Sequence, residues 1–255
     1  MRFETVIPTE RLRPFITHFV LAEHVEARSY KVLPGTGLVA GFQYAGRLSM
    51  ADKDGDTLLA TAGITGMLDK FRDFKNSAIT GSVLVYFTPT GLAHFSFCPV
   101  NELFGQSVAL DHIFDRHSVQ QTEEELSLAK NDAQRITAVE KFFLSQLKEI
   151  RKDHLIIEAV KTIYIHKGNI RIADLSKKLL ISQSPLEKRF RRLVGSTPGK
   201  FASVVRFNAV LKDLHGEKSL TEICYEHQFF DQAHFIHDFR QYTGSTPGHF
   251  RKGSL

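Results

Sequence analysis

The hydrophobic positions divide the chain into a first part that alternates like β-strands and a second part with helical spacing. In the first part, Leu38, Ala40 and Phe42 alternate with smaller or polar residues, and an apolar run occupies residues 83–87. Glycine and proline close such stretches at short intervals, which is typical of an antiparallel barrel or sandwich. Residues 1–121 are therefore predicted to form a β-rich domain.

Helical spacing begins at Thr122, and no glycine or proline interrupts residues 122–152. Leu126, Val139 and Phe142 fall on helical stripes in this stretch. It is predicted to form a connector of one or two helices. The connector packs either on its own β domain or against the same segment of a second chain.

The remaining residues, 153–255, contain two copies of one pattern. The apolar positions of the first copy are matched in the second, and the copies end in GSTPGKF and GSTPGHF: Ile172, Leu175, Leu186 and Phe190 correspond to Leu220, Ile223, Phe235 and Phe239. The second copy has one additional residue, which falls in a turn where a loop can absorb it. An internal repeat of this kind indicates a duplicated structural unit, and each copy fits a helix-turn-helix.

Between the copies, residues 198–216 are predicted to form one long helix with Pro198 near its start and Gly216 at its end. Such a helix sets the two units at a fixed separation, so that they contact successive major grooves on one face of a duplex. In the first unit, Ser182 or Ser184 is expected to cap the second helix. The predicted fold is α+β, with a β-barrel domain followed by an all-α domain of two helix-turn-helix units.

The second helix of each unit leaves polar side chains outside, and an exposed helix start of this type can read base edges in a major groove. The predicted base-reading residues are Gln183, Ser184, Glu187 and Lys188 in the first unit, and Gln232, Ala233, Ile236 and His237 in the second. The second set is less polar, so we expect it to read less sequence. Phosphate contacts, which anchor without reading sequence, are predicted for Arg191, Arg192, Lys200, Arg206, Arg251 and Lys252.

The charge distribution agrees with a nucleic-acid partner for the repeated part alone. The chain carries a net charge of +5; residues 1–152 have 17 basic and 18 acidic side chains, whereas residues 153–255 have 16 and 10. The basic excess of residues 153–255 indicates a polyanionic partner such as double-stranded DNA for that part. The nearly neutral residues 1–152 are expected to have a different task.

Length and composition predict a two-domain protein of the cytoplasm. The 255 residues are 42% apolar, no run is long enough to span a membrane, and the first residues lack the continuous apolar stretch of a signal peptide. Cys98 and Cys224 have no paired spacing and are expected to be small buried side chains. Phe87, Phe95 and Phe97 are expected in a core rather than in a pocket.

An enzymatic alternative is a metal-dependent barrel, which needs several histidines and a carboxylate that converge. The histidines of the first part are scattered and are predicted to lie at the surface or to make single hydrogen bonds: His18, His24, His94, His112 and His117. No nucleophile elbow or phosphate loop occurs, so no catalytic residue, cofactor or metal is predicted. The acidic stretch 52–56 lacks the distal glutamate of a calcium loop and is predicted to be a turn. Metal content would test this alternative.

The two units resemble the DNA-binding domain of the AraC/XylS family of bacterial transcriptional regulators. The resemblance covers about the last hundred residues and includes the FxxxxGxTPxxFR pattern from Phe239 to Arg251. It implies promoter DNA as partner and a regulatory, activating role, with RNA polymerase, a small-molecule effector and a second copy as further candidate partners. LxPFI, LPG and FTPTG, which begin at Leu12, Leu33 and Phe87, are loosely similar to cupin-like sensor domains.

Four positions depart from the family pattern. Ser176 and Cys224 replace an alanine in the first helix of each unit, and both are small enough for close helix packing. Gln228 replaces the glycine of the second turn, so it is expected to adopt a left-handed conformation at a cost of about 1 kcal/mol. His237 stands where the family often has arginine. A third alternative, a helix-turn-helix fold used only for protein contacts, predicts binding that does not weaken with salt.

Overall fold

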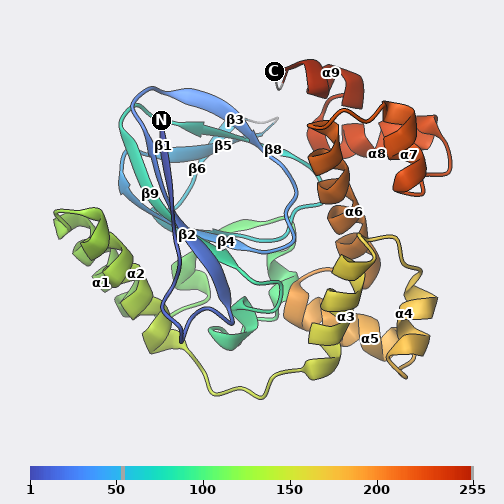
Figure 1. The fold of residues 1–255 in the computed structure, drawn as a ribbon. Helices are drawn as coiled ribbons and strands as arrows, with labels where there is room; N and C mark the ends of the chain where they lie inside the picture. Colours follow the sequence, from blue (N-terminus) through green and yellow to red (C-terminus); the bar gives the residue numbers. More distant parts are fainter. Residues whose placement is uncertain (53–54, 254–255) are drawn as a thin grey trace.

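The computed structural model describes residues 1–52 and 55–253 of the chain. A β-rich part is followed by two helices that cover one side of it, and then by a helical part that lies along another side (Figure 1). The centre of the turn predicted at 52–56 lies outside the described residues. Among the helices that the structure describes, none is both long and apolar enough to cross a membrane.

The β-rich part consists of two antiparallel sheets. The six-stranded sheet has the order β1 (Arg2–Val6), β2 (Ile16–His24), β9 (Thr80–Phe87), β4 (Val39–Ala45), β7 (Ala62–Thr65) and β10 (Ser107–Ala109). The four-stranded sheet has the order β3 (Arg28–Val32), β8 (Arg72–Asn76), β5 (Leu48–Asp52) and β6 (Gly55–Leu58). Strand pairing among the described residues does not join the two sheets, so the predicted closed barrel is corrected to two facing sheets.

The six-stranded sheet is built as its sequence alternation predicts. Pro14 lies in the preceding turn and β2 begins two residues later, while Ala40 and Phe42 of β4 are fully buried. One face of this sheet packs against the helices α1 (Arg116–Leu128) and α2 (Asp132–Gln146). Phe42 meets Phe142 and Phe143 edge-on, with ring centroids 5.7 and 6.2 Å apart. The connector helices therefore pack on their own β domain, the first of the two predicted arrangements.

Two expectations about the N-terminal part are wrong. Phe87 and Phe95 are core residues, but the side chain of Phe97 is 84% exposed, with the Lys148 ammonium 3.2 Å from its ring centroid. Cys98 is only half-buried, whereas Cys224 is buried, and both thiols are free. The turn after η1 (Leu92–His94) points Phe97 outward, which a count of phenylalanines in the sequence does not reveal.

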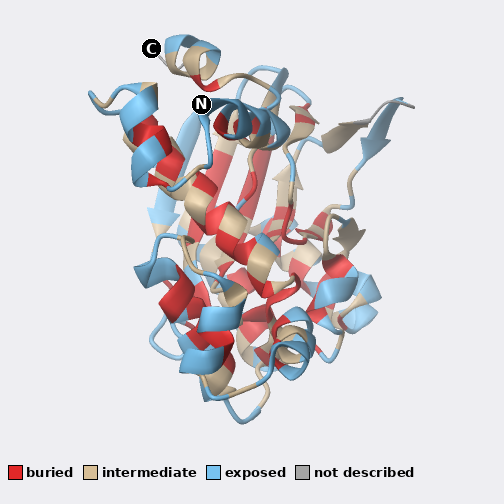
Figure 2. Ribbon diagram, turned by 90° about the vertical axis from the view of Figure 1, so that its right-hand side faces the viewer, coloured by how far each residue is buried: buried red, intermediate tan, exposed pale blue. Residues whose placement is uncertain are grey.

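The C-terminal part is helical throughout. Its helices are α3 (His154–Ile165), α4 (Ile172–Lys178), α5 (Gln183–Val194), α6 (Pro198–Leu214), α7 (Leu220–Glu226), α8 (Gln232–Thr243) and α9 (Pro247–Gly253). The long helix α6 begins where predicted. The Thr197 side chain caps it by accepting a hydrogen bond from Lys200 N, and Pro198 lies in the first turn. It buries side chains along its whole length (Figure 2). Ser182, the first of the two candidates, occupies the N-cap position of α5, but its side chain makes no capping hydrogen bond.

Each helix-turn-helix unit has a hydrophobic core of its own. The first contains Leu175, Leu186 and Phe190 together with Phe201 of α6, and the second contains Ile223, Phe235 and Phe239 with Phe207 of α6. The repeat predicted from the sequence therefore corresponds to two separately packed modules on one helix.

Both turns contain a left-handed residue that is not glycine. Leu180 between α4 and α5 and Gln228 between α7 and α8 both have φ of +53°. The left-handed conformation expected for Gln228 is confirmed, and the first turn has the same geometry at Leu180. The additional residue of the second copy therefore lies after the left-handed position. Leu180 is 95% exposed, so its side chain gains almost no packing in return for this strain.

Replacing Leu180 by glycine is expected to raise the free energy of unfolding by up to about 1 kcal/mol, because glycine adopts positive φ without the steric cost. Urea denaturation measures the change. Lys177→Gly in α4 is the matched control, since an exposed helical position should lose about 1 kcal/mol on the same substitution. A loss at Leu180 as large as that at Lys177 would contradict the strain argument.

Candidate nucleic-acid interface

The helix α5 places its predicted reading residues on the surface and its apolar residues in the core. Gln183, Ser184 and Lys188 are exposed, whereas Leu186 and Phe190 are completely buried. Glu187 is half-buried and accepts hydrogen bonds from the Arg191 guanidinium, at 2.9 Å from Nε and 2.7 Å from Nη2. This pair must open before either residue binds DNA, so the unpaired start of α5 is the better candidate reading surface.

The helix α8 repeats this arrangement in the second unit. All four predicted residues are exposed: Gln232, Ala233, Ile236 and His237. Asp231 caps the helix by accepting from His234 N at 2.7 Å, and Gln232 Nε2 donates to Thr221 Oγ1 at 2.7 Å. The second unit therefore offers a mixed apolar and imidazole surface, with its one amide already engaged.

The six predicted phosphate contacts fall into two groups. Arg191, Arg192 and Lys252 are exposed, and neither Arg192 nor Lys252 has an ion-pair partner among the residues that the structure describes. The other three are occupied within the protein. Arg206 lies 4.4 Å from the Phe229 ring centroid and 3.4 Å from Asp238 Oδ2, Arg251 donates to Lys218 O at 2.8 Å, and Lys200 is held by the N-terminal domain.

The segment Gly66–Phe71, here called the docking segment, joins the N-terminal domain to the helices. Met67 is buried in the core of the first unit, and Asp69 Oδ2 is 2.7 Å from Lys200 Nζ. The Phe71 ring lies 4.3 Å from Lys31 Nζ, which donates to Thr243 O at 3.4 Å. These contacts were not predicted, because nothing in the sequence marks an exposed-looking loop as an interdomain contact.

The docking contacts lie at the C-terminal ends of α5 and α8, away from their reading starts. Gly195 and Gly244 terminate the two helices with φ of +93° and +73°. A Cβ at Gly195 would lie 3.0 Å from Val100 Cγ1, and a Cβ at Gly244 would lie 2.8 Å from the Phe71 ring. Both GSTPG turns thus pack against the N-terminal domain, while the starts of both reading helices stay exposed.

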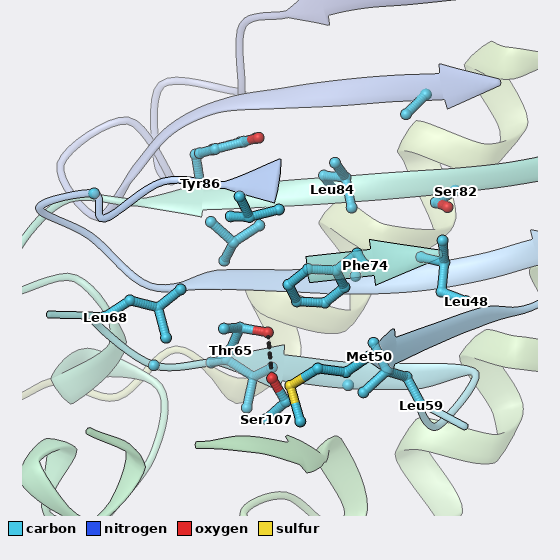
Figure 3. A pocket seen from close by; sticks show the side chains of 18 of the residues that line it. Leu48, Met50, Leu59, Thr65, Leu68, Phe74, Ser82, Leu84, Tyr86 and Ser107 are labelled. Carbon is cyan, nitrogen blue, oxygen red and sulfur yellow. Dashed lines mark hydrogen bonds between the residues drawn. The ribbon is translucent and has the colours of Figure 1, made fainter. Parts of the chain in front are cut away.

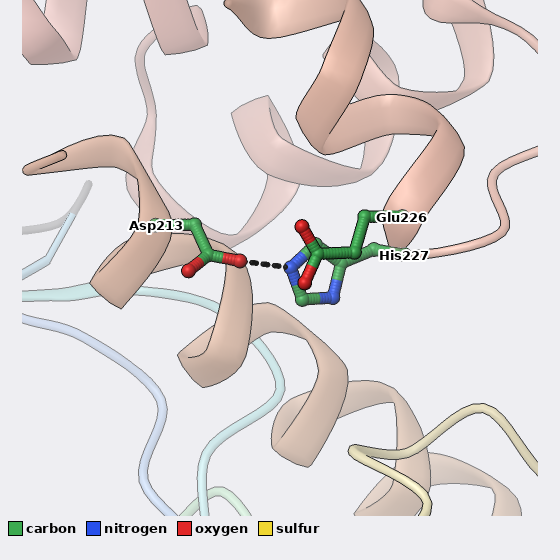
Figure 4. A group of neighbouring side chains, drawn as sticks. All are labelled: Asp213, Glu226 and His227. Atoms are coloured by element: carbon green, nitrogen blue, oxygen red, sulfur yellow. Dashed lines mark hydrogen bonds and ion pairs between the residues drawn. The ribbon is translucent and has the colours of Figure 1, made fainter. Parts of the chain in front are cut away.

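A buried polar pair connects α6 to the second unit (Figure 4). Asp213 Oδ2 lies 2.7 Å from Nε2 of the fully buried His227. This hydrogen bond, assisted by Lys218, lowers the pKa of the Asp213 carboxyl. Asp213, Glu226 and His227 lie close enough together for a metal ion, but the Lys218 ammonium already pairs with both carboxylates. We therefore assign the group a structural role, holding α7 to α6.

A cavity of about 850 Å³ lies between the two sheets (Figure 3). Its wall is mostly apolar and includes Leu48, Met50, Leu59, Leu68, Phe74 and Leu84. Tyr164 of α3 and Asn208 of α6 also line it, so the cavity touches the helical part. His18, His24 and His112 line it as well, but the group of metal-capable side chains found among the described residues is the one at Asp213.

Two protein-family models match the chain. A helix-turn-helix domain matches residues 175–253, and a domain of unknown function (DUF6597) matches residues 4–109. The first match covers most of both units and α6, and the second covers the two sheets. The two matched regions do not overlap, and residues 110–174 lie between them.

Curated relatives match over less than half of this chain. An uncharacterized HTH-type transcriptional regulator, YdeC of Bacillus subtilis, is 28% identical over 41% of this chain and 36% of its own length. The Msm operon regulatory protein of Streptococcus mutans is 33% identical over 45% of this chain and 42% of its own length. The matched region therefore spans well under half the length of either relative.

Solved structures are similar at low sequence identity. A structure of ToxT from Vibrio cholerae has a TM-score of 0.47 and 11% identity over 92% of this chain and 96% of that one. The xylose-binding transcription activator XylR has a TM-score of 0.37 and 24% identity over 42% of this chain and 30% of that one.

Two helices with exposed starts lie on separately packed modules, α5 in the first and α8 in the second. Together with the domain match, they define a protein with a double helix-turn-helix domain behind a β-rich domain. The helix-turn-helix part of the chain is similar to regulators of the AraC/XylS type. Both curated relatives, YdeC and the Msm protein, are described as regulators by their names.

Proposed function

We propose that this protein is a cytoplasmic transcription factor that binds promoter DNA with α5 and α8 in adjacent major grooves. We interpret the β-rich part as a cupin-like sensor domain. A small molecule in the cavity between its two sheets controls DNA binding. RNA polymerase and a second copy of the chain are further proposed partners.

One observation carries this proposal. Both units bury the same apolar positions and expose three of the four corresponding outer positions, Glu187 being half-buried, at the start of the helix that follows a left-handed turn. In helix-turn-helix proteins, the N-terminal residues of this helix contact base edges. The exposed Arg192, in the last turn of α5, and Lys252, in α9, supply positive charge for phosphate contacts.

Lys188→Ala is expected to relax discrimination at one base pair by about 1–3 kcal/mol, because an exposed lysine at a reading helix start donates to guanine. Arg192→Ala is expected to weaken all sequences alike and to reduce the slope of affinity against salt by about one unit. A selection from random duplexes gives the preferred site, and mobility-shift titrations at several salt concentrations measure both effects.

Lys141→Ala in α2 is the matched control, since it removes an exposed positive charge from a helix that packs on the β-rich domain, outside both helix-turn-helix units. It should change neither specificity nor the salt slope. If the Lys188 and Arg192 variants bind every duplex as the unchanged protein does, the reading face is placed wrongly. Binding to a protein partner that does not respond to salt would favour the protein-contact alternative.

A further inference from the structure

The turn of each helix-turn-helix unit leads from a left-handed residue to the N-cap position of the reading helix. In the first unit, a single residue, Ile181, lies between Leu180 and Ser182, and its side chain packs against the core of that unit. An apolar residue directly before an N-cap commonly packs on the helix that follows and so fixes the direction in which the chain enters it. Ile181 therefore completes the first turn by packing inward.

In the second unit, two residues, Phe229 and Phe230, lie between the left-handed residue and the N-cap residue of α8. Phe229 packs on the second core, with its ring centroid 4.9 Å from that of Phe235. The side chain of Phe230 is 92% exposed. Phe229 thus takes the place of Ile181, and Phe230 is the additional residue of the second copy. Packing of the second unit does not account for an aromatic ring at this position.

Phe230 lies beside an exposed apolar face of α8. Ala233, Ile236 and His237 are exposed, and their spacing places them on one face of the helix. The helix α7, which leads into the turn, lies on the side of α6 away from the two sheets (Figure 1). Phe230, Ala233 and Ile236, here called the apolar reading surface, therefore form the start of the second reading helix, with the His237 imidazole beside them.

The polar groups at the start of α8 are engaged within the protein. Asp231 Oδ1 accepts from His234 N at 2.7 Å, and Gln232 Nε2 donates to Thr221 Oγ1 at 2.7 Å. In α5, by contrast, the exposed Lys188 makes no hydrogen bond or ion pair with the part of the chain that the structure describes. The first unit therefore offers free hydrogen-bonding groups to a groove, whereas the second unit offers mainly hydrocarbon.

A hydrocarbon surface discriminates among base pairs by one feature of the major groove. The base edges there present hydrogen-bond donors and acceptors, and thymine adds an apolar C5-methyl group. Donors and acceptors that an apolar side chain covers lose water without gaining a partner, which costs free energy. A methyl group gains free energy when the same side chain covers it. Such a surface therefore favours base pairs that contain thymine.

We propose that α8 selects thymine in its part of the DNA site, because the apolar reading surface contacts C5-methyl groups. The additional residue of the second turn supplies one of these contacts through the Phe230 ring. The first unit reads its part of the site by hydrogen bonds. This inference rests on the proposed function, since it names the chemical group that the second unit recognises in the major groove.

The probe is the duplex that the full-length protein selects from random sequences, with each thymidine in turn replaced by deoxyuridine. Deoxyuridine keeps every hydrogen-bonding group of thymidine and lacks only the C5-methyl group. Where α8 contacts the duplex, each replacement is expected to weaken binding about fourfold, the value of one buried methyl group. Thymines that α5 reads through O4 should tolerate the replacement. Mobility-shift titrations at constant salt measure both.

Phe230→Ala is expected to bind the thymine duplex about fourfold more weakly and to show no further loss when uracil replaces the thymine that the ring contacts. Phe97→Ala is the matched control, because this ring is 84% exposed but belongs to the β-rich part. It should bind like the unchanged protein and keep every loss caused by uracil. Thermal unfolding checks that both variants are folded.

Specific duplex binding with equal affinity for thymine and uracil at every position would contradict only the thymine assignment and leave the proposed function intact. A Phe230→Ala variant that keeps all of the losses caused by uracil also overturns the inference, since the ring would then face a partner other than DNA. Failure to bind any duplex would overturn the proposed function and this inference together.

Discussion

Phe190→Ala is expected to lower the free energy of unfolding by about 3–5 kcal/mol, because it removes a fully buried aromatic ring and leaves a cavity. The Phe190 ring meets Phe201 of α6 edge-on at 5.5 Å, and Leu186 lies in the same core. The substitution should therefore detach α5 from α6, and with it the reading start of the first unit. Urea denaturation gives the stability, and mobility shifts give the DNA affinity.

Phe230→Ala is the matched control, since this side chain is 92% exposed in the turn of the second unit. Its effect on stability is expected to stay within about 0.5 kcal/mol. If both alanine variants lost the same stability, the core of the first unit would be assigned wrongly.

Gly66→Ala is expected to destabilise the protein by about 3 kcal/mol or more, because a Cβ would meet backbone rather than a movable side chain. That Cβ would lie 1.7 Å from Leu103 O. Gly66 begins the docking segment, so the displaced backbone should also withdraw Met67 from the first unit and Asp69 from Lys200. Thermal unfolding measures the first effect. Limited proteolysis of residues 147–153, between α2 and α3, measures the loosening of the helical part.

Gly35→Ala provides the comparison, because a Cβ there has no atom within 4 Å and the backbone is not left-handed. It should leave both stability and proteolysis unchanged. A Gly66→Ala variant as stable and as resistant as Gly35→Ala would show that the docking segment does not hold the two parts together.

The sequence predicted those features that depend on local periodicity. The repeat, the long helix α6 and the buried positions Leu186, Phe190, Phe235 and Phe239 all follow from helical spacing, which is a property of neighbouring residues. The alternation in β4 and the apolar run in β9 similarly predicted strands. The left-handed Gln228 followed from the resemblance to a family that usually has glycine at this position.

Features that depend on distant parts of the chain were not predictable. The pairing of strands into two sheets rather than a barrel is set by which edges meet, and strand alternation is the same in either arrangement. Lys200 looks like a free cation in sequence, yet Asp69, from another domain, neutralises it. Likewise, Asp213 and His227 are 14 residues apart with α7 between them, and only the fold brings them together.

The two helix-turn-helix units expose different side chains, and this difference bears on how the protein is oriented on its DNA site. A dimer of identical chains related by a two-fold axis reads the same bases from either side. Here, Lys188 and its neighbours occupy one module, whereas Ile236 and His237 occupy the other, and α6 keeps their order fixed. On the proposed function, one chain would therefore distinguish upstream from downstream, and inverting its site at a promoter would turn the whole protein around relative to the gene.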